Sequence, residues 1–394
     1  MAADLASLVS DRRHDVADVA DVADVADVAI VGGSLAGSAA AAALARQGAR
    51  VIVLEKAHFP RSRICGEFLS GTSRPHLARL GILQSLLEAG AETIDRFSIV
   101  RENGHRVEAP LPAPVLSISR ETLDTLASNA ARDFGAEIRF GVTVLAIEGS
   151  LAGGFVLSGP NLRVRARVVV GAWGRYTPLD GRLGRDFFGS PAPLFGFKKH
   201  LVGSGAQRLI GRVVLHLFPG GYLGLSRVEG GTVNLAALVQ PRVAHEAHHD
   251  LDRLLERLRG ASPSLDRDLE GLQPEPGPIL VSEPVHLGRR FPVARDVLFV
   301  GDAAGVLDPY TGMGMSNALE TGNGAAAAIL DFLKGTMSAE ALCAAHVSTS
   351  RRISGRRFLW SRLFRPFFGG SALSRLLLPA ASPLARMAAR LTSP

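Results

Sequence analysis

Two glycine-rich segments, one near each end of the chain, each place an acidic residue beside a tight turn. The later segment, residues 300–315, reads VGDAAGVLDPYTGMGM. Asp302 is expected where a strand enters the turn, and Gly312 and Gly314 are expected to open a helix of small residues. A carboxylate there can accept a hydrogen bond from a ribityl hydroxyl, while loop amides and the helix N-terminus face the electron-rich end of a ring. These residue types predict a flavin site.

The earlier segment, residues 32–37, reads GGSLAG and is followed by Glu55 at the end of the next expected strand. Glycines in such a turn let the backbone approach a pyrophosphate, and the acid accepts hydrogen bonds from ribose hydroxyls. Ser34 replaces the usual middle glycine and is small enough for its place. We assign Gly32, Ser34, Gly37 and Glu55 to FAD rather than to an ordinary tight turn, because strand, helix and acid follow in the right order.

Hydrophobic patterning predicts the elements that hold these residues. Residues 27–31, 35–47 and 51–55 are typical of a strand, a helix and a strand, which make a βαβ unit. Ser119 is expected to cap a further helix. The Asp-Val-Ala triplets before the first strand lack helix or strand periodicity, so we interpret residues 1–26 as a disordered low-complexity extension.

The pattern changes between about residues 190 and 290, where short strands separated by glycine turns predict an antiparallel sheet. The expected strands are 194–201, 210–218, 221–228 and 231–239, with one helix at about 248–259. The predicted fold class is α/β, with a Rossmann-like FAD-binding domain, an inserted antiparallel β-sheet substrate domain and C-terminal helices. The expected boundaries are 27–190 with 290–335 for the first domain, 190–290 for the second and 336–394 for the helices and tail.

Three motifs in this order resemble the geranylgeranyl-reductase-like FAD-dependent oxidoreductases, within the p-hydroxybenzoate-hydroxylase-like superfamily of group A flavin monooxygenases. They are FPRSRICGEFLS at residues 59–70, SRETLD at 119–124, and the segment 300–316. The resemblance spans roughly residues 27–335. It implies that FAD is lined by Ala36, Glu55, Gly66, Glu67, Arg120, Val144, Asp302, Gly314 and Met315. Arg120 would offer a fork of donors to the phosphate–ribose region.

Candidate catalytic residues lie in two of these motifs. Cys65 is in the loop expected beside the flavin ring, where Arg61 and Arg63 can favour a catalytic thiolate. The alternative is a small residue that only packs in a tight loop. Tyr310, in the later glycine-rich segment, is a second candidate.

Histidines supply a third catalytic candidate and a metal question. His200 follows Lys198 and Lys199 on an expected strand, and the three can bind an acidic or phenolic group with His200 as a base. The alternative is an exposed strand face. A second group has zinc-like spacing on an expected helix, but the sequence shows no third ligand cluster, so we expect a solvated helix start and no metal. Its members are His245, His248, His249 and Asp250.

One departure from the superfamily pattern concerns the electron donor. Trp173 stands where many aromatic hydroxylases carry an aspartate that helps to organise the flavin and the nicotinamide. We expect NAD(P)H as the donor, with a separate reductase or a reduced quinone as the alternative.

Charge is distributed unevenly along the chain. The net charge is +7, yet nine arginines and no acid follow residue 350, so the first 350 residues carry about −2. A basic apolar tail indicates either peripheral contact with a membrane or a helix that caps the cavity. No zinc-finger spacing or aromatic RNA-binding motif supports a nucleic-acid partner. Two cysteines and the lack of a signal peptide favour a cytoplasmic protein.

Three functions remain open at this stage. The resemblance implies a flavin-dependent monooxygenase of an apolar aromatic small molecule, such as a phenolic polyketide or a quinone precursor. The alternative is reduction of isoprenoid carbon–carbon double bonds. A third possibility is a non-catalytic flavin-binding scaffold that docks through the tail.

Overall fold

Parallel strands around the N-terminal glycine turn form the first sheet. The structure, a computed structural model, describes residues 24–185, 193–282 and 284–368. In sheet order the strands are β17 (Val293–Ala294), β18 (Val297–Phe299), β9 (Leu162–Gly171), β1 (Asp24–Val31), β2 (Val51–Glu55) and β6 (Glu137–Phe140), with β7 (Ala146–Ser150) and β8 (Gly154–Gly159) completing a meander on β9. The pairs β18–β9, β9–β1, β1–β2 and β2–β6 are parallel. This arrangement confirms the predicted Rossmann-like domain.

β1 begins three residues earlier than predicted. Asp24 is in register with Val164 of β9, and its carboxylate lies 2.6 Å from a guanidinium nitrogen of Arg139. The long partner strand and this ion pair extend β1 into the last residues of the segment predicted to be disordered. The rest of that extension lies outside the described residues.

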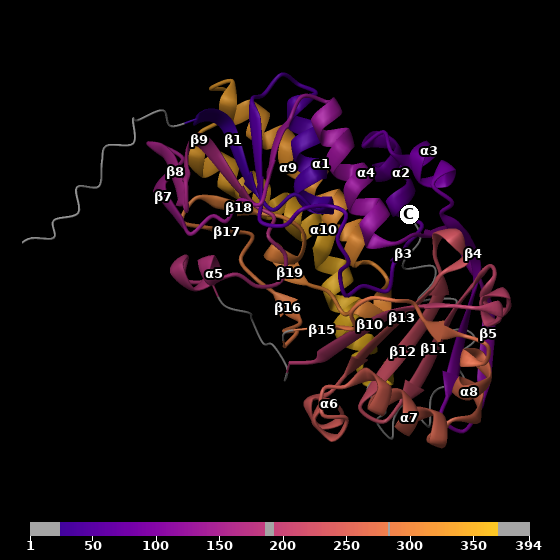
Figure 1. The fold of residues 1–394 in the computed structure, drawn as a ribbon. Coiled ribbons are helices and arrows are strands. Elements are labelled where there is room, and N and C mark those ends of the chain that lie inside the picture. Colours follow the sequence, from indigo (N-terminus) through magenta and orange to yellow (C-terminus); the bar gives the residue numbers. More distant parts are fainter. Residues whose placement is uncertain (1–23, 186–192, 283, 369–394) are drawn as a thin grey trace, which may run out of the picture.

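Helices of small residues cover this sheet. They include α1 (Leu35–Ala45), α4 (Arg120–Asp133) and α9 (Gly314–Leu333) (Figure 1). A Cβ on Gly322 of α9 would lie only 2.3 Å from the Ala36 carbonyl oxygen of α1, so glycine is needed for the two helices to pack. Ser119 caps α4, since its hydroxyl accepts a hydrogen bond from the Thr122 amide at 3.1 Å. That cap confirms the prediction. The remaining helices of this domain are α2 (Ser73–Arg79), α3 (Leu83–Glu88) and α5 (Pro178–Arg182).

The second sheet is larger than the predicted one, and it is mixed. In sheet order it contains β14 (Gln273–Pro274), β10 (Phe195–Val202), β13 (Val233–Val239), β12 (Gly221–Arg227), β11 (Arg212–Phe218), β4 (Glu92–Arg101), β5 (Arg106–Ser117) and β3 (Phe68–Leu69), with β15 (Leu280–Val281) also paired to β10. β4 is parallel to β11. Thus residues 92–117, which the sequence places in the FAD-binding segment, belong to the second sheet. A two-stranded ribbon, β16 (Gly288–Arg289) with β19 (Gly305–Val306), lies between the domains in Figure 1.

Three helices pack on one face of the second sheet. They are α6 (Pro241–Glu246), α7 (Leu251–Ala261) and α8 (Pro263–Leu269). α7 begins later than predicted because Asp250 caps it, accepting a hydrogen bond from the Arg253 amide at 3.0 Å. His245 therefore lies on α6 and His249 in the turn that follows it, rather than both on one helix face, and their ring centroids are 5.0 Å apart. His249 also contacts Phe195 edge-on.

α10 (Ala339–Phe368) is one continuous helix within the segment 336–394, which the sequence assigns to helices and a tail. The helical pattern in the sequence is clear only to about residue 349. It is tied to the first domain along its length. His346 Nε2 lies 2.9 Å from the Phe299 carbonyl oxygen, and the Ser354 hydroxyl donates to Asn317 Oδ1 of α9 at 2.8 Å. Within the described residues, no helix is both long enough and apolar enough to cross a membrane. The tail after residue 368 lies outside the described residues.

Candidate active site between the two sheets

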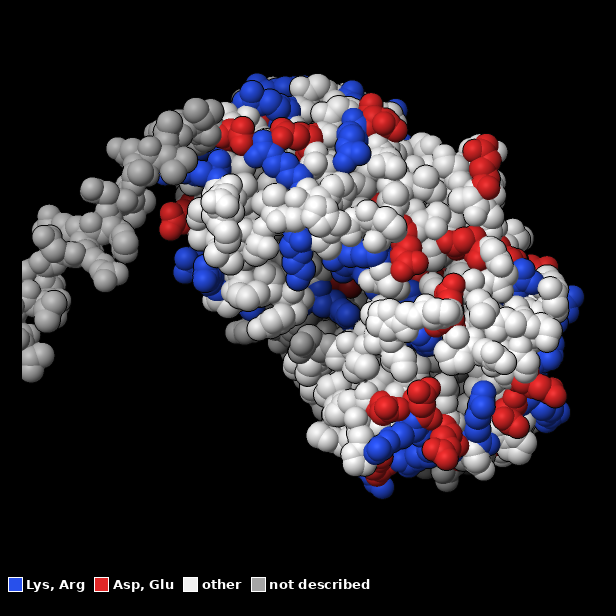
Figure 2. Space-filling model, viewed as in Figure 1, with Lys and Arg blue, Asp and Glu red and all other residues white. Residues whose placement is uncertain are grey.

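A cavity of about 1120 Å³ lies between the two domains. Its walls come from the turn after β1, the loop of residues 56–71, the segment 302–315, the second sheet and α10. Figure 2 shows Lys and Arg side chains around the hollow between the domains. Single-ligand pockets are typically about 300–1,000 Å³, so this cavity has room for a cofactor and a substrate together.

Close backbone packing shapes the turn after β1. Gly32 has a φ of 106°, and a Cβ there would lie 2.4 Å from the Ala172 carbonyl oxygen. A Cβ on Gly37 would lie 1.8 Å from the Gly32 carbonyl oxygen. Packing therefore requires both glycines. Among the four small residues predicted to bind FAD in this turn, Ser34 and Ala36 line the cavity, whereas the two glycines lie behind it.

Glu55 holds the turn to the loop that follows β2. Its carboxylate accepts hydrogen bonds from the amides of Gly33 at 2.8 Å and Ala57 at 2.9 Å, and it lies 3.1 Å from Arg61 Nη2. Its side chain is buried and is not part of the cavity wall. The contact with a ribose stays a prediction.

Two arginines of the 56–71 loop bring free donors to the cavity wall. Nε of Arg61 and Nε of Arg63 are buried and have no hydrogen-bond acceptor among the described residues, although Arg61 Nη2 is paired with Glu55 and Arg63 Nε lies 3.8 Å from Asp124 Oδ2. Burial, reinforced by the charges of Arg120 and Arg61, lowers the pKa of Arg63 to about 10. Guanidinium groups at the cavity wall that keep buried N–H donors without a hydrogen bond fit an anionic ligand group such as a diphosphate.

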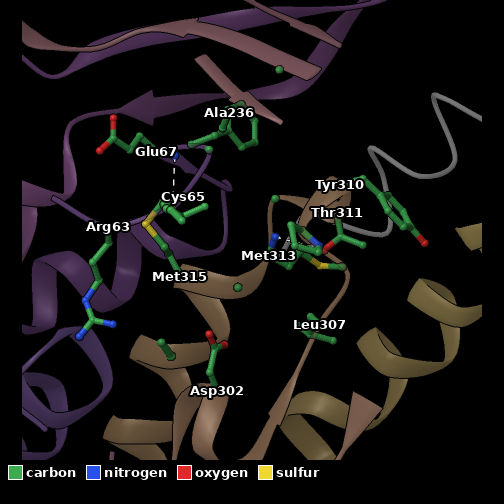
Figure 3. A pocket seen from close by; sticks show the side chains of 18 of the residues that line it. Arg63, Cys65, Glu67, Ala236, Asp302, Leu307, Tyr310, Thr311, Met313 and Met315 are labelled. Atoms are coloured by element: carbon green, nitrogen blue, oxygen red, sulfur yellow. Dashed lines mark hydrogen bonds between the residues drawn. The ribbon is translucent and has the colours of Figure 1, made fainter. Parts of the chain in front are cut away.

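Asp302 lacks a hydrogen-bond donor within the described part of the chain, whereas the arginines lack acceptors for some of their nitrogens. It follows β18 in a short 3₁₀ turn (Gly301–Ala304), and Figure 3 shows its carboxylate directed into the cavity. Burial raises the pKa of Asp302, although Arg175, Arg120 and Arg63 act in the opposite direction. No described residue donates a hydrogen bond to this carboxylate. A hydroxyl donor would satisfy it, so the residues present fit the ribityl chain and diphosphate of FAD.

Glu67 lines the cavity and is the centre of a buried polar network. The Nζ atom of Lys198 lies 2.5 Å from Oε1, and the Arg120 amide donates to the same oxygen at 2.8 Å. His200 Nε2 lies 2.8 Å from Oε2. Burial alone would raise the pKa of Glu67, but the hydrogen bond from His200 and the charge of Lys198 hold it below its usual value. Glu67 thus joins β10 of the second sheet to the start of α4.

This network excludes an exposed strand face, which was the alternative interpretation of the β10 basic residues. Lys198 and Lys199 are buried, and the Lys199 ammonium donates to the Gly277 carbonyl oxygen at 2.5 Å. His200 does not line the cavity, because Glu67 stands between its imidazole and the site. Lys198 and His200 contact the carboxylate of Glu67, so the acidic group beside them belongs to the protein and not to a ligand. Sequence patterning misses this because it cannot show that β10 is covered on both faces.

Cys65 does line the cavity. Its thiol accepts a weak hydrogen bond from the Glu67 amide at 3.4 Å and lies beside Met315 in Figure 3. The asparagine amide of Asn234 donates to the Cys65 carbonyl oxygen at 3.0 Å, which fixes the loop to β13. Other predicted cofactor residues also form the wall, namely Gly66, Arg120, Gly312, Gly314 and Met315. Val144 is buried and does not contact the cavity.

Tyr310 lines the cavity with its ring, but its hydroxyl points to α10. The hydroxyl donates to the Ser361 carbonyl oxygen. Burial raises the pKa of Tyr310, with the nearby charge of Asp308 acting in the same direction. Asp308 in turn lies 2.7 Å from Arg365 Nη2 and accepts a hydrogen bond from the Ser361 hydroxyl at 3.0 Å. These contacts fasten the loop at residues 308–311 to α10. A catalytic role of Tyr310 stays a prediction.

Trp173 occupies the place that an aspartate fills in many aromatic hydroxylases. Its indole Nε1 is directed toward Asp180 Oδ1 at 3.4 Å. Asp180 is itself paired with Arg185 at 2.7 Å and Arg290 at 2.9 Å, and all three ion-pair partners are buried. Trp173 lines the cavity, so the wall here is aromatic where the predicted pattern has a carboxylate.

Several wall residues were not found by sequence reasoning. Arg175 follows β9 directly, and its position at the carboxyl end of a parallel strand was an available signal. Arg356 and Trp360 reach the cavity only because α10 folds back on the segment 305–310. No local pattern reveals that contact.

Comparison with known proteins agrees with this geometry. Residues 25–199 match the family model described as an FAD binding domain. The menaquinone reductase of Mycolicibacterium smegmatis is 30% identical over 314 residues, which are 75% of this chain and 74% of that protein. The kynurenine 3-monooxygenase of Salinispora arenicola is 28% identical and covers 74% of this chain and 69% of its own length.

Solved structures share the fold. A flavin-dependent brominase superimposes with a TM-score of 0.78 at 21% identity, covering 93% of each chain. The p-nitrophenol 4-monooxygenase of Pseudomonas putida superimposes with a TM-score of 0.75 at 18% identity, covering 94% of this chain and 96% of its own. At these identities the likeness concerns the fold alone.

Proposed function

We propose that this chain, which belongs to the p-hydroxybenzoate-hydroxylase-like family of FAD-dependent oxidoreductases, is a monooxygenase of an elongated apolar aromatic compound. Phenolic polyketides and quinone precursors are examples of such compounds. The observation that carries the proposal is the wall that the second sheet presents to the cavity, because its length and lack of charge match such a molecule.

Five neighbouring strands build that wall. β5, β4, β11, β12 and β13 all contribute lining residues, including Val115, Phe97, Leu215, Tyr222 and Leu238. At about 4.8 Å between strands, five strands span about 19 Å. Among the described lining residues, these strands contribute no charged side chain. The wall therefore fits a long apolar molecule better than a small polar one.

The protein's own groups perform the binding and positioning. Bound FAD supplies the redox chemistry and, in a monooxygenase, the activation of dioxygen. Asp302 would hold the ribityl hydroxyls, while Arg61 and Arg63 would hold the diphosphate. The amides at the start of α9, near Gly314, favour negative charge on the ring that they face. The apolar sheet excludes water from the reacting atoms.

We propose NAD(P)H as the electron donor. Lys56 and Arg175 line the same cavity as Arg61 and Arg63, so cationic side chains are available for a second phosphorylated ligand. Trp173 offers an aromatic surface beside them for a nicotinamide or adenine ring.

Reduction of an isoprenoid double bond is the second candidate. A specific observation favours it, since the relative at 30% identity over three quarters of both chains is called a menaquinone reductase. The same apolar wall would accept a polyprenyl chain. A geranylgeranyl-reductase-like activity is the form of this candidate that the loop around Cys65 supports.

One experiment separates the two reactions. The FAD-loaded protein is supplied with NADPH and a prenylated naphthoquinol. Parallel reactions are run under labelled dioxygen and under nitrogen, and the product masses are measured by mass spectrometry. A monooxygenase forms product only with dioxygen, and that product gains one labelled oxygen atom. A reductase works under nitrogen, and its product gains two hydrogen atoms. Flavin reoxidation without any change of the substrate would reject both reactions for this substrate.

A further inference from the structure

α10 forms part of the cavity wall near its last turns. Arg356, Arg357 and Trp360 line the cavity. Arg357 is held in place by Glu320 of α9, whereas Arg356 is largely exposed to solvent. One side of Arg356 therefore borders the cavity and the other borders the outside of the molecule.

The same helix carries a second, outward face. Arg352, Arg356, Leu359 and Leu363 follow one another at intervals of four, three and four residues, which places them along one side of a helix with 3.6 residues per turn. Leu359 is 64% exposed and Leu363 is 57% exposed. These two large apolar side chains lie on adjoining turns, so they form one apolar patch and are not isolated surface residues. Because Arg356 belongs to both faces, this patch adjoins the cavity.

Positive charge surrounds the two leucines. Arg351, Arg352, Arg356 and Arg362 are exposed, and the sequence has no acidic residue after Glu340. The carboxylates that contact the helix are already engaged, Glu320 by Arg357 and Asp308 by Arg365. An exposed cationic face of this kind attracts an anionic partner.

We propose that this α10 face, made of Arg351, Arg352, Arg356, Leu359, Arg362 and Leu363, docks on an anionic lipid surface and delivers a lipid-dissolved substrate to the cavity. The delivery step builds on the proposed function, whereas the docking does not depend on it. Arginine stems can lie along the apolar part of the interface while their guanidinium groups contact lipid phosphates. A bilayer is also where an elongated apolar substrate resides, so a surface that borders the cavity gives it a path that avoids water.

The expected effects are large enough to measure. Replacing Arg351, Arg352 and Arg362 together by glutamine should weaken binding to anionic vesicles roughly 100-fold, since each arginine near such a surface adds about fivefold. Replacing Leu359 and Leu363 by serine should weaken it by a further ~10-fold or more, because apolar insertion is lost. Raising the salt concentration should weaken vesicle binding by the wild-type protein and have little effect on vesicle binding by the arginine variant.

The test is co-sedimentation of the full chain with vesicles of phosphatidylglycerol and phosphatidylcholine, compared with vesicles of phosphatidylcholine alone. Matched controls are Ile210→Ser, which removes a side chain that is 52% exposed on the second domain, and Arg253→Gln on exposed α7. Every variant is first compared with the wild type by FAD absorbance and thermal unfolding. The proposal expects binding that requires anionic lipid, is lost in both α10 variants and is kept in both controls.

Three results would overturn the proposal. Unchanged vesicle binding in the α10 variants would reject this face, and a chain ending at residue 368 that no longer binds would assign binding to the later residues. A shift of the α10 variants from dimer to monomer in sedimentation velocity, with vesicle binding unchanged, would make this face an interface between copies. Vesicle binding needs no turnover, so failure of the proposed reaction leaves this test intact.

Discussion

Lys198 and Glu67 form an ion pair in which both side chains are almost fully buried, with Nζ 2.5 Å from Oε1. The lysine belongs to β10 of the second sheet, whereas the glutamate sits in the loop before β3 and also accepts a hydrogen bond from the α4 amide of Arg120. One carboxylate therefore fixes the second sheet against the cofactor domain. The shape of the cavity between the two domains therefore depends on the contacts of Glu67.

Glu67→Gln should destabilise the protein by about 3–5 kcal/mol at neutral pH, because it leaves the Lys198 ammonium buried without a counter-ion. The pKa of Glu67 is lowered in the folded state, so its stabilising effect is complete above its unfolded value near 4.5 and is lost as pH falls through the folded pKa. Urea unfolding of wild type and variant should therefore converge in acid. Glu275→Gln, which changes an exposed neighbour of His200, is the control. Adding Lys198→Met to Glu67→Gln should recover part of the lost free energy of unfolding, because it removes the unpaired buried charge.

Asp302→Ala should weaken FAD binding about 10- to 100-fold, because it removes an acceptor that faces the cavity and has no donor of its own. Fluorescence titration of the apoprotein with FAD measures this directly. Asp331→Asn, on the exposed side of α9, should bind FAD like the wild type. Full affinity in Asp302→Ala would remove this residue from the cofactor site.

Tyr310→Phe should keep turnover within about twofold and lower stability by about 1 kcal/mol, the usual size of one lost hydrogen bond. The reason is that the hydroxyl donates to the Ser361 backbone rather than to the cavity. Steady-state rates and urea unfolding should be measured on the same preparation. A tenfold loss of turnover with FAD still bound would support a catalytic role of Tyr310.

His346 should make stability depend on pH near neutrality. Burial lowers its pKa below 6.5 in the folded protein, while its ring Nε2–H donates a hydrogen bond to the Phe299 carbonyl oxygen. Between the two pKa values the unfolded chain binds the extra proton, so the free energy of unfolding falls as pH drops below about 6.5. His346→Gln should flatten that slope between about pH 7 and pH 5. His105→Gln, at the exposed β4–β5 turn, should leave the slope unchanged.

Local signals were sufficient for the elements that hold the cofactor end of the cavity. β2 was predicted at residues 51–55 and is observed there, and the Ser119 cap was predicted from its side chain alone. A fully buried valine-rich strand and an N-cap leave clear marks, since each depends on a few adjacent residues. The acid after each glycine-rich turn was found for the same reason.

The second sheet was only partly predictable, because its pairing is distant in the sequence. β4 mixes charged and apolar residues without strict alternation, and β5 contains three prolines. β11, the partner of β4, lies more than one hundred residues later. The surroundings of His200 could not be predicted for a similar reason. A basic residue on a strand can face substrate, solvent or a buried acid, and only the fold shows that Glu67 is opposite. α10 continues past residue 349 because contacts with Asn317 and Asp308 support its second half.

The pairing of β18 with β9 has a consequence for synthesis of the chain. Val168–Val170 form the buried centre of the first sheet, yet the strand that covers their outer edge, β18, is translated about 130 residues later. At about 5–20 residues per second, a ribosome leaves this edge unpaired for roughly 6–26 s. Asp302 and the loop at 308–315 emerge later still, so a nascent chain cannot complete this cavity until more than 300 residues have been made. We therefore expect newly made protein to depend on chaperones during that interval and to bind FAD only after residue 315 has emerged.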